Sequence, residues 1–369
     1  CSLLSNEFDK DIRISDVFDN RTIVEIEALL EETVEEIDLE LRDEYPLTMT
    51  QMGIFVESMR FIGTTVYNIP FLYKLSDDID MGKLQDAIST AFMAHPYIYM
   101  TIKNVDDDAV ALRNEVHPID VKIGDVLPSV EEIIQPFDLL SGEELYRVSL
   151  YDTSDGKYLF MDLHHIIADG ESFDILLEDI NRAYEGEEIE SEEFSGYEVG
   201  LTEQAFRASS RFNKAKSFYD GIFNNVDPVI LPDEEKNPDT SREDYSSVIS
   251  KVAAKKVKDY CEENGLSYNA FFTAAFGMAL KSYTGTDKAL FATIYNGRSD
   301  SRTNRSVTML VKTLPVLLEA HTNDTVVKYI TECQNYLINA MANDIVSFSE
   351  LSSSYGIDSD ILFAYQGGG

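Results

Sequence analysis

The chain has 369 residues, more than one ordinary hydrophobic core accommodates, which predicts two or three folding units. Its 67 acidic and 30 basic side chains give a net charge of -37, which repels phosphate backbones and anionic lipid surfaces and argues against nucleic-acid or membrane partners. Three cysteines are too few for a disulfide framework or a thiolate metal site, and neither a signal peptide nor an apolar run of about 18 residues is present, so we expect a cytoplasmic protein.

Residues 1–44 are predicted to form a short helical unit of their own. Thr22 and Glu25 have the spacing of a capping box, and the apolar positions that follow them predict a helix. Residues 33–44 are largely acidic and predict a frayed helix end that runs into a solvated linker.

A second unit is predicted over residues 45–227. Thr48 and Gln51 form another capping box that opens a helix. Alternating and 3.6-residue apolar patterns then predict further elements in chain order. These are a strand over 66–75, a helix over 81–92, a hairpin of 98–104 with 109–114, a strand pair of 146–151 with 158–163, a helix over 172–184 and a helical region over 197–223.

A third unit is predicted over residues 228–369, after a boundary at 228–241 that is rich in proline and acidic residues. The same patterns predict its elements. These are a strand over 246–252, a helix over 253–264 closed by Gly265, a helix from 267 to 283, a strand over 289–295, an apolar segment over 307–318, a helix over 324–342 and a strand over 361–366.

Chemistry is concentrated where the strand over 158–163 ends. His164 and His165, two of the five histidines, stand there side by side, with Asp169 and Gly170 in the turn that follows. Because side chains alternate along a strand, the two imidazoles must point to opposite faces. One is a candidate base and the other a candidate support, and spacing alone does not say which.

Three other interpretations of the histidine pair are weighed against this one. A metal site lacks a further His or Cys cluster to complete it. A serine hydrolase lacks a G-x-S-x-G elbow. Two satisfied core histidines would be the ordinary interpretation of an isolated pair.

The stretch His164–Gly170 resembles the HHxxxDG motif of the condensation domains of nonribosomal peptide synthetases, within the superfamily of chloramphenicol acetyltransferase. The flanking chain strengthens the resemblance. Family motifs are matched by Thr48–Gln51, Pro136–Leu139, Asn296–Arg298 and Val311–Pro315, and residues 14–23 resemble the last helices of a peptidyl carrier protein. The arginines of a further family motif are absent around His95. We interpret His95 as a structural residue.

This resemblance implies an α/β fold of two chloramphenicol-acetyltransferase-like lobes, each a mixed sheet flanked by helices, in a V-shaped pseudo-dimer. The lobes are expected at 45–227 and 228–369. The second is expected to be truncated after Gln366, and residues 1–44 to be the C-terminal helices of a carrier protein followed by an acidic linker.

The resemblance also assigns roles to residues. It gives His165 the catalytic role and His164 a packing role on the other face. Asp169 is implied to be structural, held by a salt bridge to Arg298, and Gly170 to let the backbone approach a bound thioester arm.

Lys312 and Thr313 fall in the segment that lines the substrate tunnel of the family. Lys312 stands where the family has asparagine, and the alternative interpretation of this lysine is a solvated side chain. No metal is implied.

The implied reaction is amide bond formation between an acyl or peptidyl thioester on an upstream carrier protein and the amine of an aminoacyl group on a downstream one. The domain itself binds no cofactor and acts on phosphopantetheine-tethered substrates. The implied partners are the two peptidyl carrier proteins and the adenylation domain of the same synthetase. Two alternatives stay open: an epimerisation domain, disfavoured because Phe173 replaces the usual tryptophan after Ser172, and a non-catalytic docking module for carriers.

Overall fold

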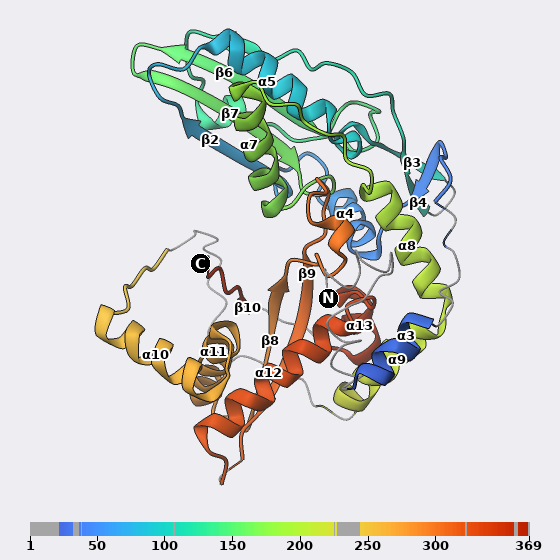
Figure 1. The fold of residues 1–369 in the computed structure, drawn as a ribbon, viewed down its shortest axis with the longest axis vertical. Helices are drawn as coiled ribbons and strands as arrows, with labels where there is room; N and C mark the ends of the chain where they lie inside the picture. The colour runs from blue at the N-terminus through green and yellow to red at the C-terminus, as the bar shows by residue number, and fades with distance from the viewer. Residues whose placement is uncertain are drawn as a thin grey trace. The chain divides into compact units, whose positions relative to one another are not determined.

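The computed structural model describes residues 22–31, 37, 39–105, 108–224, 226, 244–321, 323–357 and 361–367. They fall into two compact units (Figure 1). Unit 1 contains the described parts of Asn20–Arg211 together with Asn296–Val311, and unit 2 contains those of Phe212–Tyr295 and Lys312–Gly369. Residues 296–311, which we expected in the second lobe, therefore pack with the first.

Unit 1 contains most of the predicted strands and helices. In chain order its elements are α3 (Ile23–Glu31), β1 (Glu44–Pro46), α4 (Met49–Arg60), β2 (Asn68–Lys74), α5 (Met81–Met93), the 3-10 turn η1 (Pro96–Tyr99), β3 (Thr101–Val105), β4 (Asp108–Leu112), β5 (Lys122–Gly124), α6 (Val130–Ile133), β6 (Tyr146–Thr153), β7 (Gly156–His164), α7 (Gly170–Glu185) and α8 (Gly196–Ala208).

Two sheets organise unit 1. The larger has the strand order β2-β7-β6-β5, in which β7 pairs antiparallel with both β2 and β6, and the smaller has the order β1-β4-β3. Thr153 pairs with Gly156, which confirms the predicted hairpin turn. β7 lies inside the larger sheet, so the histidine pair at its end is held by two neighbouring strands.

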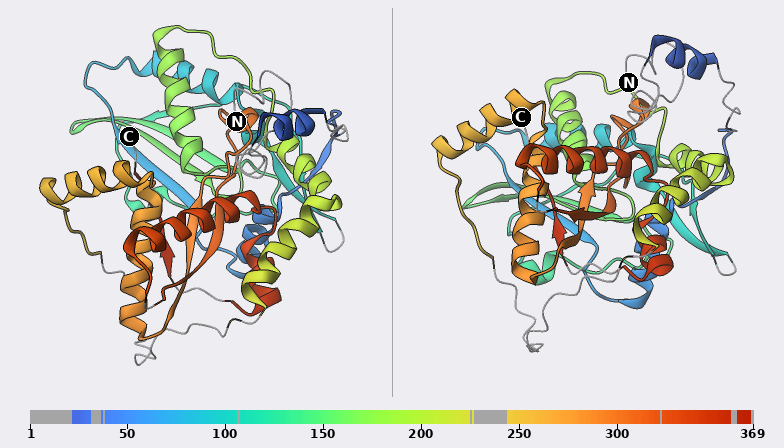
Figure 2. Two further views of the ribbon diagram at one scale, coloured as in Figure 1. Left: turned by 60° about the horizontal axis from the view of Figure 1, so that its bottom comes forward. Right: turned by 90° about the horizontal axis from the view of Figure 1, so that it is seen from below.

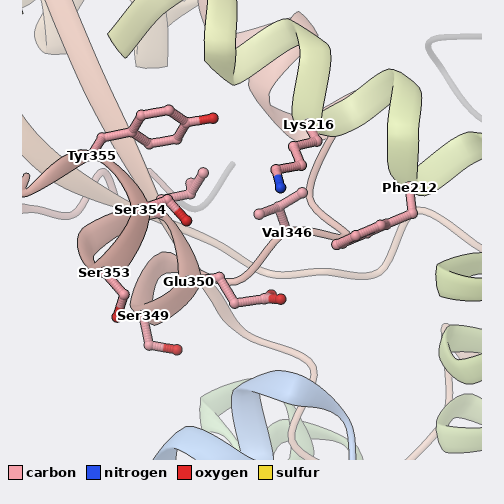
Figure 3. Close-up of a pocket in the computed structure, with 9 residues that line it drawn as sticks. Phe212, Lys216, Val346, Ser349, Glu350, Ser353, Ser354 and Tyr355 are labelled. Carbon is pink, nitrogen blue, oxygen red and sulfur yellow. The ribbon is translucent and has the colours of Figure 1, made fainter. Parts of the chain in front are cut away.

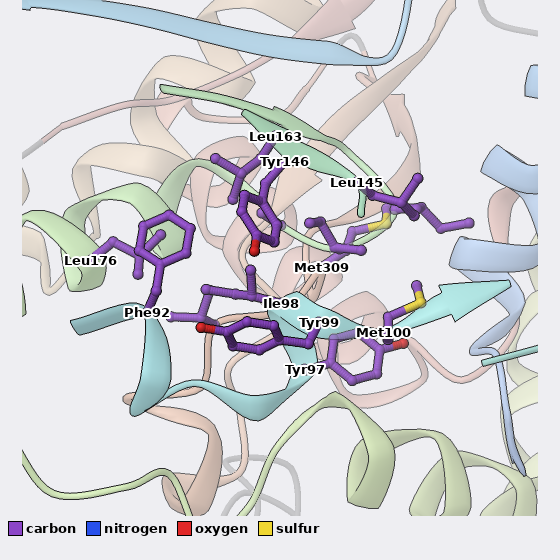
Figure 4. Close-up of a cluster of buried hydrophobic side chains, with 14 of the residues drawn as sticks. Phe92, Tyr97, Ile98, Tyr99, Met100, Leu145, Tyr146, Leu163, Leu176 and Met309 are labelled. Atoms are coloured by element: carbon purple, nitrogen blue, oxygen red, sulfur yellow. The ribbon is translucent and has the colours of Figure 1, made fainter. Parts of the chain in front are cut away.

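The core of unit 1 lies between the larger sheet and the helices α5 and α7, which cover one face of it (Figures 1 and 2). Figure 4 shows part of this core, where Phe92 of α5, Leu176 of α7 and Leu163 of β7 converge. Met309 also lies in this cluster. Burial of that side chain helps to explain why residues 296–311 pack with unit 1.

Unit 2 contains a three-stranded mixed sheet of order β10-β8-β9 with helices packed on it. Its elements are α9 (Ser210–Phe223, whose first residues belong to unit 1), α10 (Lys251–Asn264), α11 (Tyr268–Thr284), β8 (Lys288–Tyr295), β9 (Lys312–Glu319), α12 (Val326–Ala342), α13 (Phe348–Tyr355) and β10 (Leu362–Phe363), and a 3-10 turn η2 (Ser301–Thr303) lies in the segment that joins unit 1. The mixed α/β class predicted from the sequence is confirmed.

Two predicted elements differ from the structure. The strand predicted over 246–252 is wrong, because Val248 is 94% exposed, residues 244–250 have no regular structure and Ser250 caps α10. A pattern of alternating residues does not make a strand where no neighbouring strand pairs with it. In the apolar segment predicted over 307–318, only the part from Lys312 onwards is a strand.

The N-terminal predictions are tested only in part. Glu25 and Thr22 make the reciprocal hydrogen bonds of a capping box at the start of α3. Residues 1–21, which carry most of the resemblance to a carrier protein, lie outside the described residues, so that assignment stays a prediction. Over the described residues, every helix is too short or too polar to cross a bilayer.

Candidate active site

The turn that follows β7 is held by main-chain hydrogen bonds from both sides. The amide of His165 donates to the carbonyl of Tyr67 at 2.7 Å, which ties the turn to the chain just before β2. The amide of Ile167 donates to the carbonyl of His164 at 3.0 Å, closing the turn on itself. The backbone that carries both histidines is therefore fixed independently of any bound molecule.

His165 has one ring nitrogen engaged within this turn. Its Nδ1 lies 2.9 Å from the carbonyl oxygen of Ala168. Because a carbonyl oxygen can only accept, Nδ1 must carry the proton, and in the neutral ring Nε2 then carries the lone pair. The side chain is partly exposed, so this nitrogen belongs to a ring that a reactant can reach. The geometry is that of an oriented base.

His164 has the opposite environment. It is 4% exposed, its Nδ1 accepts a hydrogen bond from the amide of Ile166 at 3.1 Å, and its ring packs near those of Tyr67 and Phe137. Burial, with a smaller contribution from the neighbouring His165, lowers the pKa of His164 to about 3. The ring therefore stays neutral at all ordinary pH values and packs among apolar and aromatic neighbours.

The lowered pKa of His164 predicts a defined acid sensitivity. Below about pH 6.5 the unfolded chain binds a proton at His164, whereas the folded chain does not bind one until the pH approaches 3. The free energy of unfolding therefore decreases as the pH falls from about 6.5 towards 3. At pH 5 this costs about 2 kcal/mol relative to pH 7. His164→Asn, whose amide oxygen can still accept from Ile166, should lose this part of the pH dependence of urea unfolding. His117→Gln, which removes a 52% exposed ring, should keep it, and equal pH slopes in all three proteins would contradict the prediction.

Asp169 is the N-cap residue of α7, and five donors surround its carboxylate. It is 2% exposed. Oδ1 accepts from the amide and hydroxyl of Ser172 at 3.0 and 2.8 Å and from Nη2 of Arg298 at 3.2 Å. Oδ2 accepts from the amides of Leu310 and Val311 at 2.9 and 3.2 Å. A carboxylate so fully occupied is bound in place, with both oxygens already engaged by the fold.

Arg298 is held by the same segment that it anchors. The residue before it is Gly297, whose φ of +71° favours glycine. Any side chain at position 297 would overlap the carbonyl of Leu310. The guanidinium, 4% exposed, donates through Nη1 to the carbonyls of Thr303 and Ser306 at 2.6 and 2.9 Å, and through Nη2 to Asp169. The structure thus brings together Asp169 and Arg298, as the resemblance implied.

Gly170, the first residue of α7, has free space where a side chain would begin. A Cβ added there meets no atom within 4 Å, and its φ is not in the left-handed region. The fold therefore does not require glycine at this position.

Lys312 and Thr313, the two predicted tunnel residues, begin β9 in unit 2. The ammonium group of Lys312 lies 3.1 Å from the carbonyl oxygen and 3.4 Å from Oδ2 of Asp344. The suggestion that this lysine is simply solvated is therefore wrong, since a buried carboxylate holds it. Thr313 is half-buried and pairs with Ile294 of β8, and its role in a tunnel stays a prediction.

His95 lies in a buried polar cluster, which agrees with the structural role expected for it. Its Nδ1 is 2.7 Å from Glu192 and its Nε2 is 3.1 Å from Asp179. The ring is thus enclosed by two carboxylates. Burial lowers the pKa of His95, but the hydrogen bonds and negative charges of the two carboxylates outweigh burial, so the pKa is raised. Neither ring nitrogen is left for a reactant.

Two cavities of the structure lie apart from His165. One of about 300 Å³ is formed in unit 2 by α9 and α13, where Lys216 faces Glu350 and Ser354 (Figure 3). The other, of about 570 Å³, is lined in unit 1 by residues of 136–147, including Phe137 and Arg147. Neither is lined by a residue of the 164–170 stretch, so His165 is a candidate because of its hydrogen bonding and not because of a cavity.

The sequence patterns missed the donors to this turn that come from distant parts of the chain. The amides of Leu310 and Val311 reach Asp169 only because residues 296–311 fold back onto unit 1. Gln51 donates to the carbonyl of Ile166, although its spacing signalled only a helix cap. The polarity of a side chain gives no sign of a partner so far away in the sequence.

Comparison with known proteins identifies relatives of this fold and sequence. Residues 41–365 match the family described as Condensation domain. Bacitracin synthase 2 of Bacillus licheniformis is 22% identical over 369 residues, covering 95% of this chain and 14% of that protein. Tyrocidine synthase 2 of Brevibacillus parabrevis is 24% identical over 371 residues, covering 96% of this chain and 10% of that protein. The chain thus spans a small part of the length of these relatives.

Solved structures share the fold. The X-domain from teicoplanin biosynthesis superposes with a TM-score of 0.72 at 17% identity, covering 87% of this chain and 75% of that one. The first condensation domain of the calcium-dependent antibiotic synthetase, in complex with substrate analogue 2a, superposes with a TM-score of 0.70 at 15% identity, covering 87% of this chain and 79% of that one.

Proposed function

Since the chain belongs to the condensation-domain family, we propose that it forms an amide bond between a carrier-bound acyl or peptidyl thioester and the amine of a second carrier-bound aminoacyl group. The observation that carries the proposal is the orientation of His165, whose Nδ1 is bonded to the carbonyl of Ala168. That bond leaves Nε2 as the nitrogen able to interact with an amine.

The chemistry asked of His165 is modest. The amine attacks the thioester carbonyl, the new C–N bond forms, the C–S bond breaks, and the amine proton ends on the departing thiol. A thioester is already activated, and an α-amine has a pKa of about 7.7 to 8.0, so part of it is unprotonated at neutral pH. His165 acts by accepting the amine proton through Nε2 or by holding the amine and the tetrahedral intermediate through it.

The proposed partners follow from this reaction. The acyl and aminoacyl groups would be tethered to phosphopantetheine on an upstream and a downstream peptidyl carrier protein, and an adenylation domain of the same synthetase would supply the amino acid. The cytoplasmic location expected from the sequence belongs to the same proposal. The family match does not favour the epimerisation or docking alternatives.

A reconstitution with charged carriers tests the function. One carrier protein is loaded with an acyl group, a second with an amino acid, and the two are mixed with the chain. An acyl-aminoacyl product on the second carrier, detected by intact-protein mass spectrometry, is expected. Inversion of the amino acid on a single carrier, without transfer, would instead identify an epimerase.

Gly170 provides a second test of where the substrate arm passes. Gly170→Ala should not lower the melting temperature, because the added methyl group meets free space, yet it should lower kcat/KM by about tenfold to a hundredfold if a thioester arm occupies that space. Gly221→Ala in α9 is the matched control, since its Cβ also meets no atom within 4 Å. Equal activity of the two variants would show that no reactant passes Gly170.

A further inference from the structure

Gln51, at the third position of α4, uses all four hydrogen-bonding positions of its side-chain amide. It is 1% exposed. Its Oε1 accepts from the amide and the hydroxyl of Thr48, at 3.0 and 3.1 Å, which completes the capping box of the helix. Its Nε2 donates to the hydroxyl of Tyr97 at 2.9 Å and to the carbonyl of Ile166 at 2.8 Å. One end of the amide therefore serves the helix and the other serves the turn that carries His165.

The helix cap alone does not account for glutamine at this position. Glutamate accepts from a cap residue as well as glutamine does. Four other capping boxes of the described chain have glutamate in the equivalent place: Glu25, Glu132, Glu198 and Glu350. A carboxylate at position 51 would cap α4 equally but could not donate to Ile166. The difference between the two residue types is the donor.

The carbonyl that Gln51 holds belongs to the residue after His165. Ile166 is fully buried, at 0% exposure, so its oxygen has no recourse to bulk water. The orientation of this peptide unit fixes the path of the chain after His165, and with it the position of Ala168. The carbonyl of Ala168 accepts the hydrogen bond from Nδ1 of the His165 ring. Gln51 is thus connected to the imidazole through two residues of one tight turn.

We infer that Gln51 is a positioning residue, which holds the peptide of Ile166 so that the imidazole of His165 keeps its proton on Nδ1 and its lone pair on Nε2. The inference rests on the proposed function for its kinetic consequence, but not for its structural one. Gln51 itself touches no reactant.

The test compares Gln51→Glu and Gln51→Met with Thr48→Ala in the full chain. Gln51→Glu keeps an acceptor for the cap and loses the donor, whereas Gln51→Met loses both. Thr48→Ala weakens the start of the same helix and leaves the two Nε2 bonds in place. Both Gln51 variants should lower kcat for amide formation by about tenfold to a hundredfold with little change in KM, and Thr48→Ala should lower only the melting temperature.

A second measurement does not depend on turnover. In protein with ¹⁵N-labelled histidine, the ring nitrogens of His165 report which one is protonated. The wild type and Thr48→Ala should show a single Nδ1–H tautomer, and the Gln51 variants a mixture of tautomers. If no variant or wild-type protein forms an amide but this spectral difference is present, the proposed function fails and the positioning role of Gln51 stands.

Two results would overturn the inference. One is a folded Gln51→Glu protein in which both the ¹⁵N spectrum of His165 and the kcat equal those of the wild type. The other is an equal fall of kcat in Thr48→Ala and both Gln51 variants, because the common defect would then be the helix start. If Gln51→Met fails to fold, Gln51→Glu and Tyr97→Phe still separate these outcomes. Tyr97→Phe removes only the other acceptor of Nε2, so His165 should keep its wild-type tautomer in that variant.

Discussion

Replacement of His165 by alanine should lower the rate of amide formation by about 10² to 10⁴-fold, if the imidazole accepts the proton of the attacking amine. The ring is the group in the turn whose Nε2 is left available once Nδ1 is bonded to Ala168. Its loss removes one hydrogen bond within the turn, so the fold should persist with a destabilisation of about 1 kcal/mol. The rate is measured as product on the second carrier in single-turnover conditions, which separates chemistry from carrier release.

His117→Ala serves as the control for this variant, because it removes an exposed histidine from the same unit. It should transfer the acyl group at the wild-type rate. A His165→Ala protein that is folded and transfers within about threefold of the wild type would remove His165 from the chemistry, since proton transfer by a positioned side chain typically contributes at least 10²-fold. An intermediate loss would assign it to positioning of the amine.

The elements around the histidine pair could be predicted because their signals are local. β7 has apolar residues on both faces, a turn with glycine joins it to β6, and Asp169 with Ser172 forms a cap directly before the amphipathic α7. Each of these patterns lies within one element or between two neighbouring elements of the chain. The burial of His164 follows in the same way, from its place at the end of β7, whereas His165 lies in the turn that follows the strand.

The supports of the site could not be predicted because they join distant segments. Residues 296–311 leave β8 of unit 2, pack with unit 1 and return to β9, so the carboxylate of Asp169 meets donors about 130 to 140 residues away in the chain. Only the Asp169–Arg298 pair was anticipated, and it came from a family resemblance and not from a pattern in the residues. The environment of Lys312 was predicted wrongly for the same reason. A charged residue in an apolar run suggested solvation, because nothing in the sequence pattern indicated that Asp344 is its partner.

Asp169→Ala and Arg298→Ala should both be strongly destabilising, at a cost of about 3 to 5 kcal/mol each, because either change leaves a buried charge without its partner. Asp169→Ala should cost more. It leaves Arg298 without its counter-charge and the amides of Leu310 and Val311 unpaired, and it also removes the cap of α7, whereas Arg298→Ala leaves four donors on the carboxylate. For a unit of this size the melting temperature should fall by roughly 10 °C.

The cost of the cap alone is measured with Asp80→Ala. Asp80 caps α5 by accepting from the amides of Gly82 and Lys83, and it has no arginine partner among the hydrogen bonds of the described chain. Its loss should cost about 1 kcal/mol. The excess destabilisation in Asp169→Ala is then the contribution of the buried pair and of the amides of residues 310 and 311.

The double variant decides whether Asp169 acts with Arg298. Its destabilisation should be smaller than the sum of the two single ones, because removing the second partner relieves the charge that the first removal left buried. Thermal and urea unfolding of the four proteins measure this coupling. Strictly additive losses would separate the two residues, and an Asp169→Ala protein of wild-type stability but without activity would move Asp169 from the framework into the reaction. The five donors around its carboxylate lead us to expect neither.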